Sequence, residues 1–123
     1  MTTLVDTNIV TRLAQPAHPH HPVALAALDA LKAAGNSMCV VPQVLYEFWT
    51  VCTRPPGENG LGLSTPEAQA EQAQTLTLFA MLPDSPAIFP EWQRLVVQHD
   101  VRGKSAHDAR LVAAMTVHGV TTC

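Results

Sequence analysis

The sequence predicts an α/β domain with three layers, in which a short and mostly parallel central sheet lies between two layers of helices. Short apolar runs alternate along the chain with longer segments of helical periodicity, and this alternation is typical of parallel sheets. The 123 residues are enough for one hydrophobic core, so we expect a single domain over residues 1–123. Apolar residues make up 47% and charged residues 14%, which is a composition of folded proteins rather than of disordered chains.

The first half of the chain is expected to contain two strands and three helices. The run TTLV predicts a buried strand that ends before Asp6, and residues 8–14 have helical periodicity. The segment QPAHPHHP interrupts that helix because its prolines cannot sit inside one, and the Ala- and Leu-rich segment 23–34 predicts a second helix. SMCVVP predicts the second strand, and QVLYEFWTVCTR predicts a helix that ends before two consecutive prolines.

The second half begins with a loop rich in glycine and proline, PPGENGLGLS, and is expected to continue with three helices. Ser64 and Glu67 have the spacing of a capping box, which predicts a helix from there to about Met81. The short run AIF predicts a third strand, and PEWQRLVVQHD predicts a helix. AHDARLVAAMTVHG predicts a last helix closed by Gly119, and the final VTTC predicts the start of a fourth strand.

Charge and cysteine content narrow the class of protein. The formal net charge is −3, whereas a protein that binds nucleic acid mainly through phosphate contacts is usually basic. A metal-dependent enzyme is compatible with this charge, because bound cations neutralise the phosphate. The three cysteines fit no zinc or redox spacing. No segment has the pattern of a membrane span or a signal peptide, so the cytoplasm is the expected location.

Three acidic residues stand where the surrounding sequence is apolar. Asp6 follows the first strand, at the edge where open α/β sheets build their sites; Glu47 and Asp108 lie in apolar helical patterns. Carboxylates in such surroundings need a partner, and one hard divalent cation satisfies several at once. Three simpler interpretations stay open. Asp6 caps a helix by accepting from the amide of residue 8 or 9, Asp108 stabilises a helix dipole, or Glu47 lies on an exposed face.

The ordered segments LVDTNIV, YEFWTVCTRP, GLGLS and GKSAHDARLVAAM resemble the PIN-domain family, and within it the VapC-type toxins of bacterial toxin–antitoxin pairs. The resemblance implies a PIN-like α/β/α fold and a ribonuclease that depends on Mg²⁺ or Mn²⁺. It implies that Asp6, Glu47 and Asp108 are the catalytic and metal-binding residues. Asn8 matches the polar residue that supports the first acid, and Ser105 is expected behind the acids or at a helix cap.

Basic residues are candidates for contacts with the RNA backbone. The candidates are Arg12, Arg54, Arg102, Lys104 and Arg110. We expect at least half of them to be ordinary surface charge. Arg54 is the first choice, because the segment CTRP around it matches the family. The histidines of HPHHP are expected to lie in a surface loop rather than to bind a metal.

The resemblance also implies partners and leaves alternatives open. VapC-type toxins cleave RNA, are neutralised by a small cognate antitoxin and commonly form homodimers. The family usually has a fourth acid in a segment resembling Thr-x-Asn-x-x-Asp-Phe, and the sequence ends at Cys123, where that segment should begin. We therefore expect either a truncated chain or a site with three acids. One alternative is a catalytically impaired PIN-like binding protein. A phosphatase of the haloacid dehalogenase type is a weaker one, because it requires an acid in place of Asn8.

Overall fold

The computed structural model describes residues 2–120 of the chain. None of the helices in this part has the length and hydropathy needed to cross a membrane. The helices and strands are, in chain order, β1 Thr2–Leu4, α1 Thr7–Leu13, α2 His21–Ala33, β2 Ser37–Val40, α3 Pro42–Thr53, the 3₁₀ turn η1 Pro56–Glu58, α4 Thr65–Leu78, β3 Ala80–Met81, α5 Ile88–Gln98 and α6 Ser105–His118.

The strands of the described residues form one parallel sheet in the order β1-β2-β3, which confirms the predicted α/β class. The central strand is β2, in which Cys39 is aligned with Leu4 on one side and with Ala80 on the other. Past the end of β1, the N–H of Val5 still donates to the carbonyl of Cys39 at 2.8 Å. Because the strands run in the same direction, their carboxyl ends lie along one edge, where the chain turns into α1 and α3.

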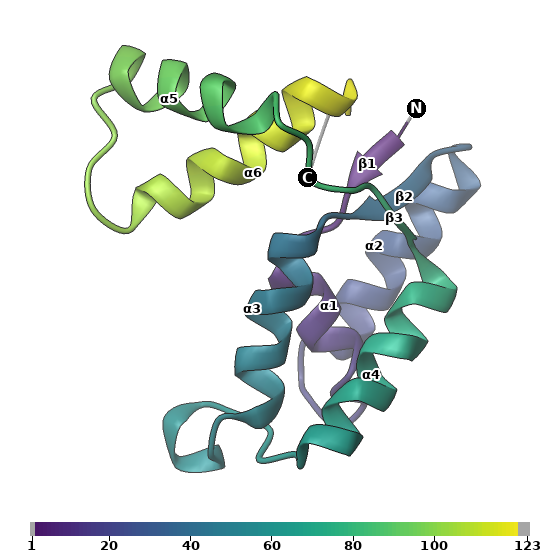
Figure 1. Cartoon of the computed structure of the whole chain (residues 1–123). Coiled ribbons are helices and arrows are strands. Elements are labelled where there is room, and N and C mark those ends of the chain that lie inside the picture. The colour runs from purple at the N-terminus through teal and green to yellow at the C-terminus, as the bar shows by residue number, and fades with distance from the viewer. Residues whose placement is uncertain (1, 121–123) are drawn as a thin grey trace.

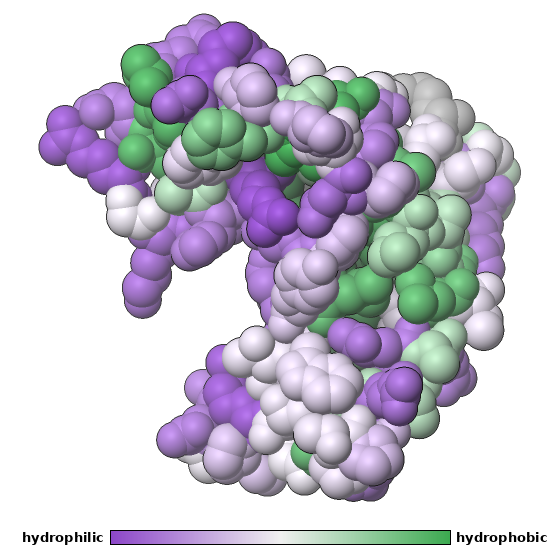
Figure 2. Space-filling view, viewed as in Figure 1, coloured by the Kyte–Doolittle hydropathy of each residue, from purple (hydrophilic) through white to green (hydrophobic). Residues whose placement is uncertain are grey.

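The helices cover the sheet in two groups, with α1 to α4 on one side and a hairpin of α5 and α6 on the other (Figure 1). The core lies between them. Leu4, Val40, Val44 and Phe48 have no exposed surface, and Ala113 joins them from α6. The space-filling view of the same face is hollowed between the α5–α6 hairpin and α3 (Figure 2). The two helix groups therefore meet at the sheet and diverge away from it.

The predicted position of the third strand was wrong. The segment AIF, residues 87–89, begins α5 instead, and Ile88 is buried as the first residue of that helix. Pro90 is accepted two residues later because the first turn of a helix needs no N–H donor there. The actual third strand is Ala80–Met81, directly after α4. It pairs only two residues with β2, so it is too short to give a periodic signal in the sequence.

The other predicted helices are present, with ends shifted by a few residues. α2 starts at His21, because Pro22 fits the first turn of a helix, and α4 ends at Leu78 rather than near Met81. Gly119 ends α6 as predicted, in the left-handed conformation with φ of 69°. The predicted fourth strand begins at Val120, which belongs to no strand, and the rest of that segment lies outside the described residues.

Ser64 caps α4 as predicted. Its Oγ accepts from the N–H of Glu67 at 3.3 Å, and its own N–H donates to Oε1 of Glu67 at 2.9 Å. Hydrogen bonding of the Glu67 carboxylate to the backbone N–H of Ser64, and then to the Ser64 side chain, lowers the pKa of Glu67. The stability that the ionised Glu67 contributes is therefore fully present above the ordinary pKa of a glutamate. It is lost as the pH falls through the lowered value.

Replacing the cap, Ser64→Ala, should lower the free energy of unfolding by about 1 kcal/mol, because the N–H of Glu67 loses its acceptor. Urea unfolding measures the change. Thr65→Ala is the matched control, since Thr65 is exposed in the same turn and its hydroxyl makes no hydrogen bond within residues 2–120. Equal unfolding free energies for the two variants would contradict the role of the capping box.

Candidate functional site

Asp6 connects the first strand to the first helix. It is the N-cap of α1, and its Oδ1 accepts from the N–H of Ile9 at 3.1 Å. The helix-cap interpretation of this residue is thus confirmed. The cap uses one carboxylate oxygen, and the side chain is only partly buried. Asp6 therefore keeps a second oxygen for other contacts while the cap fixes its direction.

Glu47 lies on α3 with two donors around its carboxylate. Thr7 Oγ1 donates to Oε2 at 3.2 Å, and Gln43 Nε2 donates to Oε1 at 2.9 Å. The residue is exposed, so it lies on the open face of an otherwise buried helix rather than among apolar side chains. Each oxygen of Glu47 is held by a neighbour, and the carboxylate is oriented without a salt bridge.

Asp108 stands in the first turn of α6, on the other helix group. The start of α6 is tied to α3 by Gln43, whose Nε2 also donates to the carbonyl of His107 at 2.8 Å. Gln43 is 7% exposed, and its Oε1 is buried without a partner among the described residues. Sequence reasoning missed this residue, although its position one helical turn before Glu47 was a signal.

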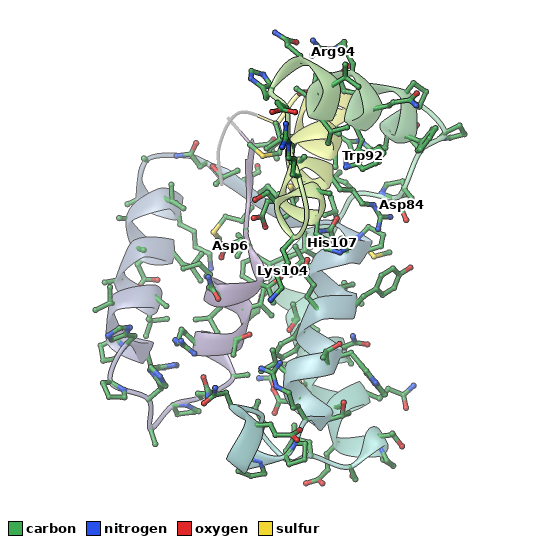
Figure 3. The ribbon with its side chains drawn as sticks, turned by 90° about the vertical axis from the view of Figure 1, so that its left-hand side faces the viewer. Asp6, Asp84, Trp92, Arg94, Lys104 and His107 are labelled. Atoms are coloured by element: carbon green, nitrogen blue, oxygen red, sulfur yellow. The ribbon has the colours of Figure 1, made fainter. Side chains whose placement is uncertain are left out.

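The three predicted acids line one cavity of about 400 Å³. Its lining comes from the start of α1, the exposed face of α3 and the first half of α6: Asp6, Thr7, Asn8, Glu47, Thr50, Val51, Arg54, Asp108 and Leu111. We call this the acidic cavity. Within residues 2–120 none of the three acids forms a salt bridge. Figure 3 shows Asp6 at the end of β1, with Lys104 and His107 from the start of α6.

The donor groups of the acidic cavity are of the kind that a hard divalent cation requires. Carboxylate, amide and hydroxyl oxygens line it, and within residues 2–120 no thiol or imidazole does. Nevertheless, no three His, Cys, Asp or Glu side chains of the described residues are close enough together to form a ready metal site. Glu47 and Asp108 are exposed at the lining of the cavity, where Thr7 and Gln43 hold the carboxylate of Glu47. The donor set thus fits Mg²⁺ or Mn²⁺ in chemical kind, and binding requires the carboxylates to converge.

Asn8 and Arg54 line the acidic cavity with the acids, whereas Ser105 does not. Ser105 is the first residue of α6, and the cap position before it belongs to Lys104, which makes no side-chain cap bond. Of the other basic candidates, Arg102 pairs with an aspartate two residues before it at 2.9 Å. Arg110 pairs with Asp84 at 3.4 Å. The expectation of surface charge holds for those two arginines.

Arg54 is positioned by the loop that follows α3. That loop turns back along the helix end, where the N–H groups of Leu61 and Leu63 donate to carbonyls of the last turn at 2.9 and 2.8 Å. The N–H of Gly62 donates to the carbonyl of Arg54 at 2.9 Å. The side chain of Arg54 donates through Nη2 to the carbonyl of Asn59 at 3.1 Å. The loop therefore satisfies carbonyls that the helix end leaves unpaired and holds the guanidinium in place.

The fold and the cavity define the class: an α/β domain with acidic residues collected at the carboxyl edge of a parallel sheet. A family model described as PIN domain matches residues 3–122. The chain belongs to the PIN-domain family. No curated protein matches the sequence.

Solved structures share the fold over almost the whole chain. VapBC2 from Rickettsia felis, bound to a DNA fragment from their promoter, gives a TM-score of 0.70 at 14% identity over 99% of this chain and 85% of that one. VapC20 from Mycobacterium tuberculosis, a sarcin-ricin loop cleaving toxin, gives a TM-score of 0.66 at 23% identity and covers 98% of this chain and 85% of that one. FitAcB from Neisseria gonorrhoeae gives a TM-score of 0.61 at 21% identity, with 99% of this chain and 85% of that one covered. At these identities the likeness concerns the fold.

Gly60→Ala should destabilise the loop behind Arg54, because a Cβ at Gly60 would overlap the carbonyl oxygen of Arg54. We expect the free energy of unfolding to fall by about 1–3 kcal/mol, as for other overpacked positions. Gly57→Ala is the matched control in the same loop, since a Cβ there meets no atom within 4 Å. Guanidinium unfolding of the two variants measures the difference, and an unchanged Gly60→Ala protein would contradict the close approach.

Proposed function

We propose that this chain is a VapC-type toxin, a metal-dependent endoribonuclease that hydrolyses RNA phosphodiester bonds. One observation carries the proposal. In a chain of the PIN-domain family, Asp6, Glu47 and Asp108 come from three separate elements and line the same cavity. The fold neighbour VapC20 is described as a toxin that cleaves the sarcin-ricin loop, which supports RNA as the substrate class.

In this proposal Asp6, Glu47 and Asp108 would hold Mg²⁺ or Mn²⁺. The cation, when bound, supplies an activated water and offsets the negative charge that develops on the phosphate. The chain itself does the positioning. The cap on α1 orients Asp6, while Thr7 and Gln43 orient Glu47 through its two oxygens. The acids are ligands rather than nucleophiles.

An antitoxin is the proposed protein partner. The fold neighbours VapBC2 and FitAcB support such a partner for this chain. The homodimer implied by the family resemblance stays a prediction, as does the cytoplasmic location. Both depend on the assignment to the VapC type.

The second candidate is a catalytically impaired PIN-like binding protein. One observation favours it: the carboxylates line the acidic cavity without already forming a three-ligand group within the described residues. If Glu47 and Asp108 cannot converge with Asp6, the cavity would not hold a cation. Metal binding and RNA cleavage therefore separate the two candidates.

Asp6→Asn should reduce cleavage of a structured RNA in Mn²⁺ or Mg²⁺ by roughly 100-fold or more, because it removes one charge from the proposed metal site. Asparagine caps helices as well as aspartate does, so the start of α1 is retained. Asp29→Asn is the matched control, since Asp29 is exposed on α2 and lies outside the acidic cavity. Undiminished cleavage by Asp6→Asn would refute the assignment of Asp6.

Calorimetric titration with Mg²⁺ and Mn²⁺ tests the metal directly. The wild-type protein should bind the cation, and Asp108→Asn should bind it at least about tenfold more weakly, because it loses one charged ligand. Asp29→Asn again serves as the control. No heat of binding at millimolar metal would favour the catalytically impaired binding protein.

A further inference from the structure

A second cavity of about 510 Å³ adjoins the acidic cavity. It lies beside the loop after α3 and is lined by Thr7, Asn8, Thr11, Arg12, Gln15, His18, Val51, Arg54, Asn59 and Gly60. Four of these residues also line the acidic cavity: Thr7, Asn8, Val51 and Arg54. Asp and Glu are absent from the lining described here, so we call it the basic cavity. The two cavities share lining residues, but carboxylates predominate in one and arginines in the other.

The two arginines of the basic cavity are the arginines that the described part of the chain leaves without carboxylate partners. The chain has seven Lys and Arg residues. Three of them, Arg94, Arg102 and Arg110, are paired with carboxylates. Arg12 and Arg54 form no such pair within residues 2–120, and both line the basic cavity. The two lysines lie outside it.

The guanidinium of Arg54 is fixed but not neutralised. Its Nη2 donates to the carbonyl of Asn59 at 3.1 Å, and its Nε is buried with no partner among the described residues. A partly buried cation with an unsatisfied donor is costly, and an anion nearby reduces that cost. The loop that carries Asn59 and Gly60 therefore holds Arg54 in a state that favours an anionic ligand.

Arg12 is the second arginine that lines the basic cavity. Its Nη1 donates to Oε1 of Gln15 at 3.0 Å, a neutral partner that orients the side chain without cancelling its charge. Next to it, partial burial lowers the pKa of His18, and the charges of Arg12 and His20 lower it further. Two arginines without a carboxylate partner among the described residues thus line this one cavity, although the whole chain has a net charge of −3.

We propose that the basic cavity is a subsite for a phosphate of the RNA backbone. It lies next to the acidic cavity, where the RNA strand would be cleaved. The identity of the ligand as RNA rests on the proposed function, whereas the preference for an anion rests on Arg12 and Arg54. A chain of negative net charge needs a local cationic site to hold a polyanion, and these two arginines supply it. A backbone phosphate in this subsite fixes the register of the strand without reading its sequence.

The position of the subsite predicts the path of a bound RNA strand across the two cavities. Arg54 lines both cavities, so a strand bound there runs from the acids, past Arg54, towards Arg12. The neutral groups around the arginines, from Asn8, Thr11 and Gln15, are hydrogen-bonding partners that do not repel phosphate. Arg12 is therefore a positioning residue outside the acidic cavity, and its removal should affect binding before it affects chemistry.

Arg12→Gln tests the subsite by removing its charge with a side chain of similar polarity. The probe is a short fluorescein-labelled oligouridylate, and its binding is measured by anisotropy in EDTA, where no metal-dependent cleavage occurs. We expect the affinity to fall about tenfold, the effect of one lost charged hydrogen bond. The slope of log K against log salt should decrease in magnitude by about 0.7, as for one lost phosphate contact with a single strand.

Lys32→Gln is the matched control. Like Arg12, Lys32 is a basic residue in the last turn of a helix, but it lies outside the basic cavity. Its removal changes the net charge and the helix end equally and should leave the salt slope unchanged. Arg12→Lys retains the charge and should restore most of the slope. Circular dichroism shows whether each variant is folded.

The outcomes distinguish the subsite from the nuclease. Weaker RNA binding by Arg12→Gln than by Lys32→Gln supports the subsite even if the wild-type protein cleaves no RNA. Equal binding by the two variants overturns the subsite even if the wild-type protein is an active nuclease. If Arg12→Gln binds the probe normally but loses an acidic protein partner, the cavity takes a carboxylate and the proposal is also overturned. A wild-type protein that does not bind the probe at low salt overturns it as well.

A methylphosphonate series locates the phosphate. One uncharged linkage at a time replaces a phosphate in the oligouridylate. The wild-type protein should lose affinity at one linkage in particular, and Arg12→Gln should be insensitive to that same linkage. The same linkage dependence in both proteins would place the phosphate elsewhere and contradict the proposal.

Discussion

The amide group of Gln43 joins the two helix groups that carry the acids. Its two N–H bonds reach the carboxylate of Glu47 on its own helix and the carbonyl of His107, one residue before Asp108. A single buried side chain thus sets the position of one acid and the start of the helix that carries another. Its Oε1 is unpaired among the described residues, which costs stability. An apolar residue there would remove that cost together with the two hydrogen bonds to Glu47 and His107.

The structural and the functional interpretations of Asp6 are compatible. Its backbone is extended, with φ of −85° and ψ of 172°, so it continues the direction of β1 and delivers the side chain to the carboxyl edge of the sheet. Oδ1 accepts from Ile9, and this bond stabilises α1 and restricts the carboxylate. The cap is therefore the means by which a short strand presents an oriented acid. Replacing Asp6 by asparagine removes the negative charge but keeps the helix cap, so this substitution separates the two roles.

The sequence predicted the class of fold from local signals, whereas the three acids that line the acidic cavity were grouped by the resemblance to the PIN-domain family. Strand ends, helix periodicity and the capping box at Ser64 are read over a few residues. The strand at Ala80–Met81 and the start of α5 were missed, because pairing with β2 and burial of Ile88 are tertiary effects. Arg12 and Arg54 were named as candidates for RNA contacts, but the cavity that they share was not predicted, for the same reason. Arg12 and Arg54 are far apart in sequence and meet only through the packing of α1 on α3.

The acidic and the basic cavity would have different roles in binding a polyanion. The carboxylates of the acidic cavity repel a phosphate until a cation neutralises them, so they cannot attract RNA by themselves. In the proposed function, the arginines of the basic cavity would attract RNA without a metal, and Arg54 lines both cavities. Affinity for the backbone and retention of the proposed cation would thus depend on different residues. Salt should weaken the first much more than the second, because the arginines would act on a solvated strand and the acids would act at short range on a bound ion.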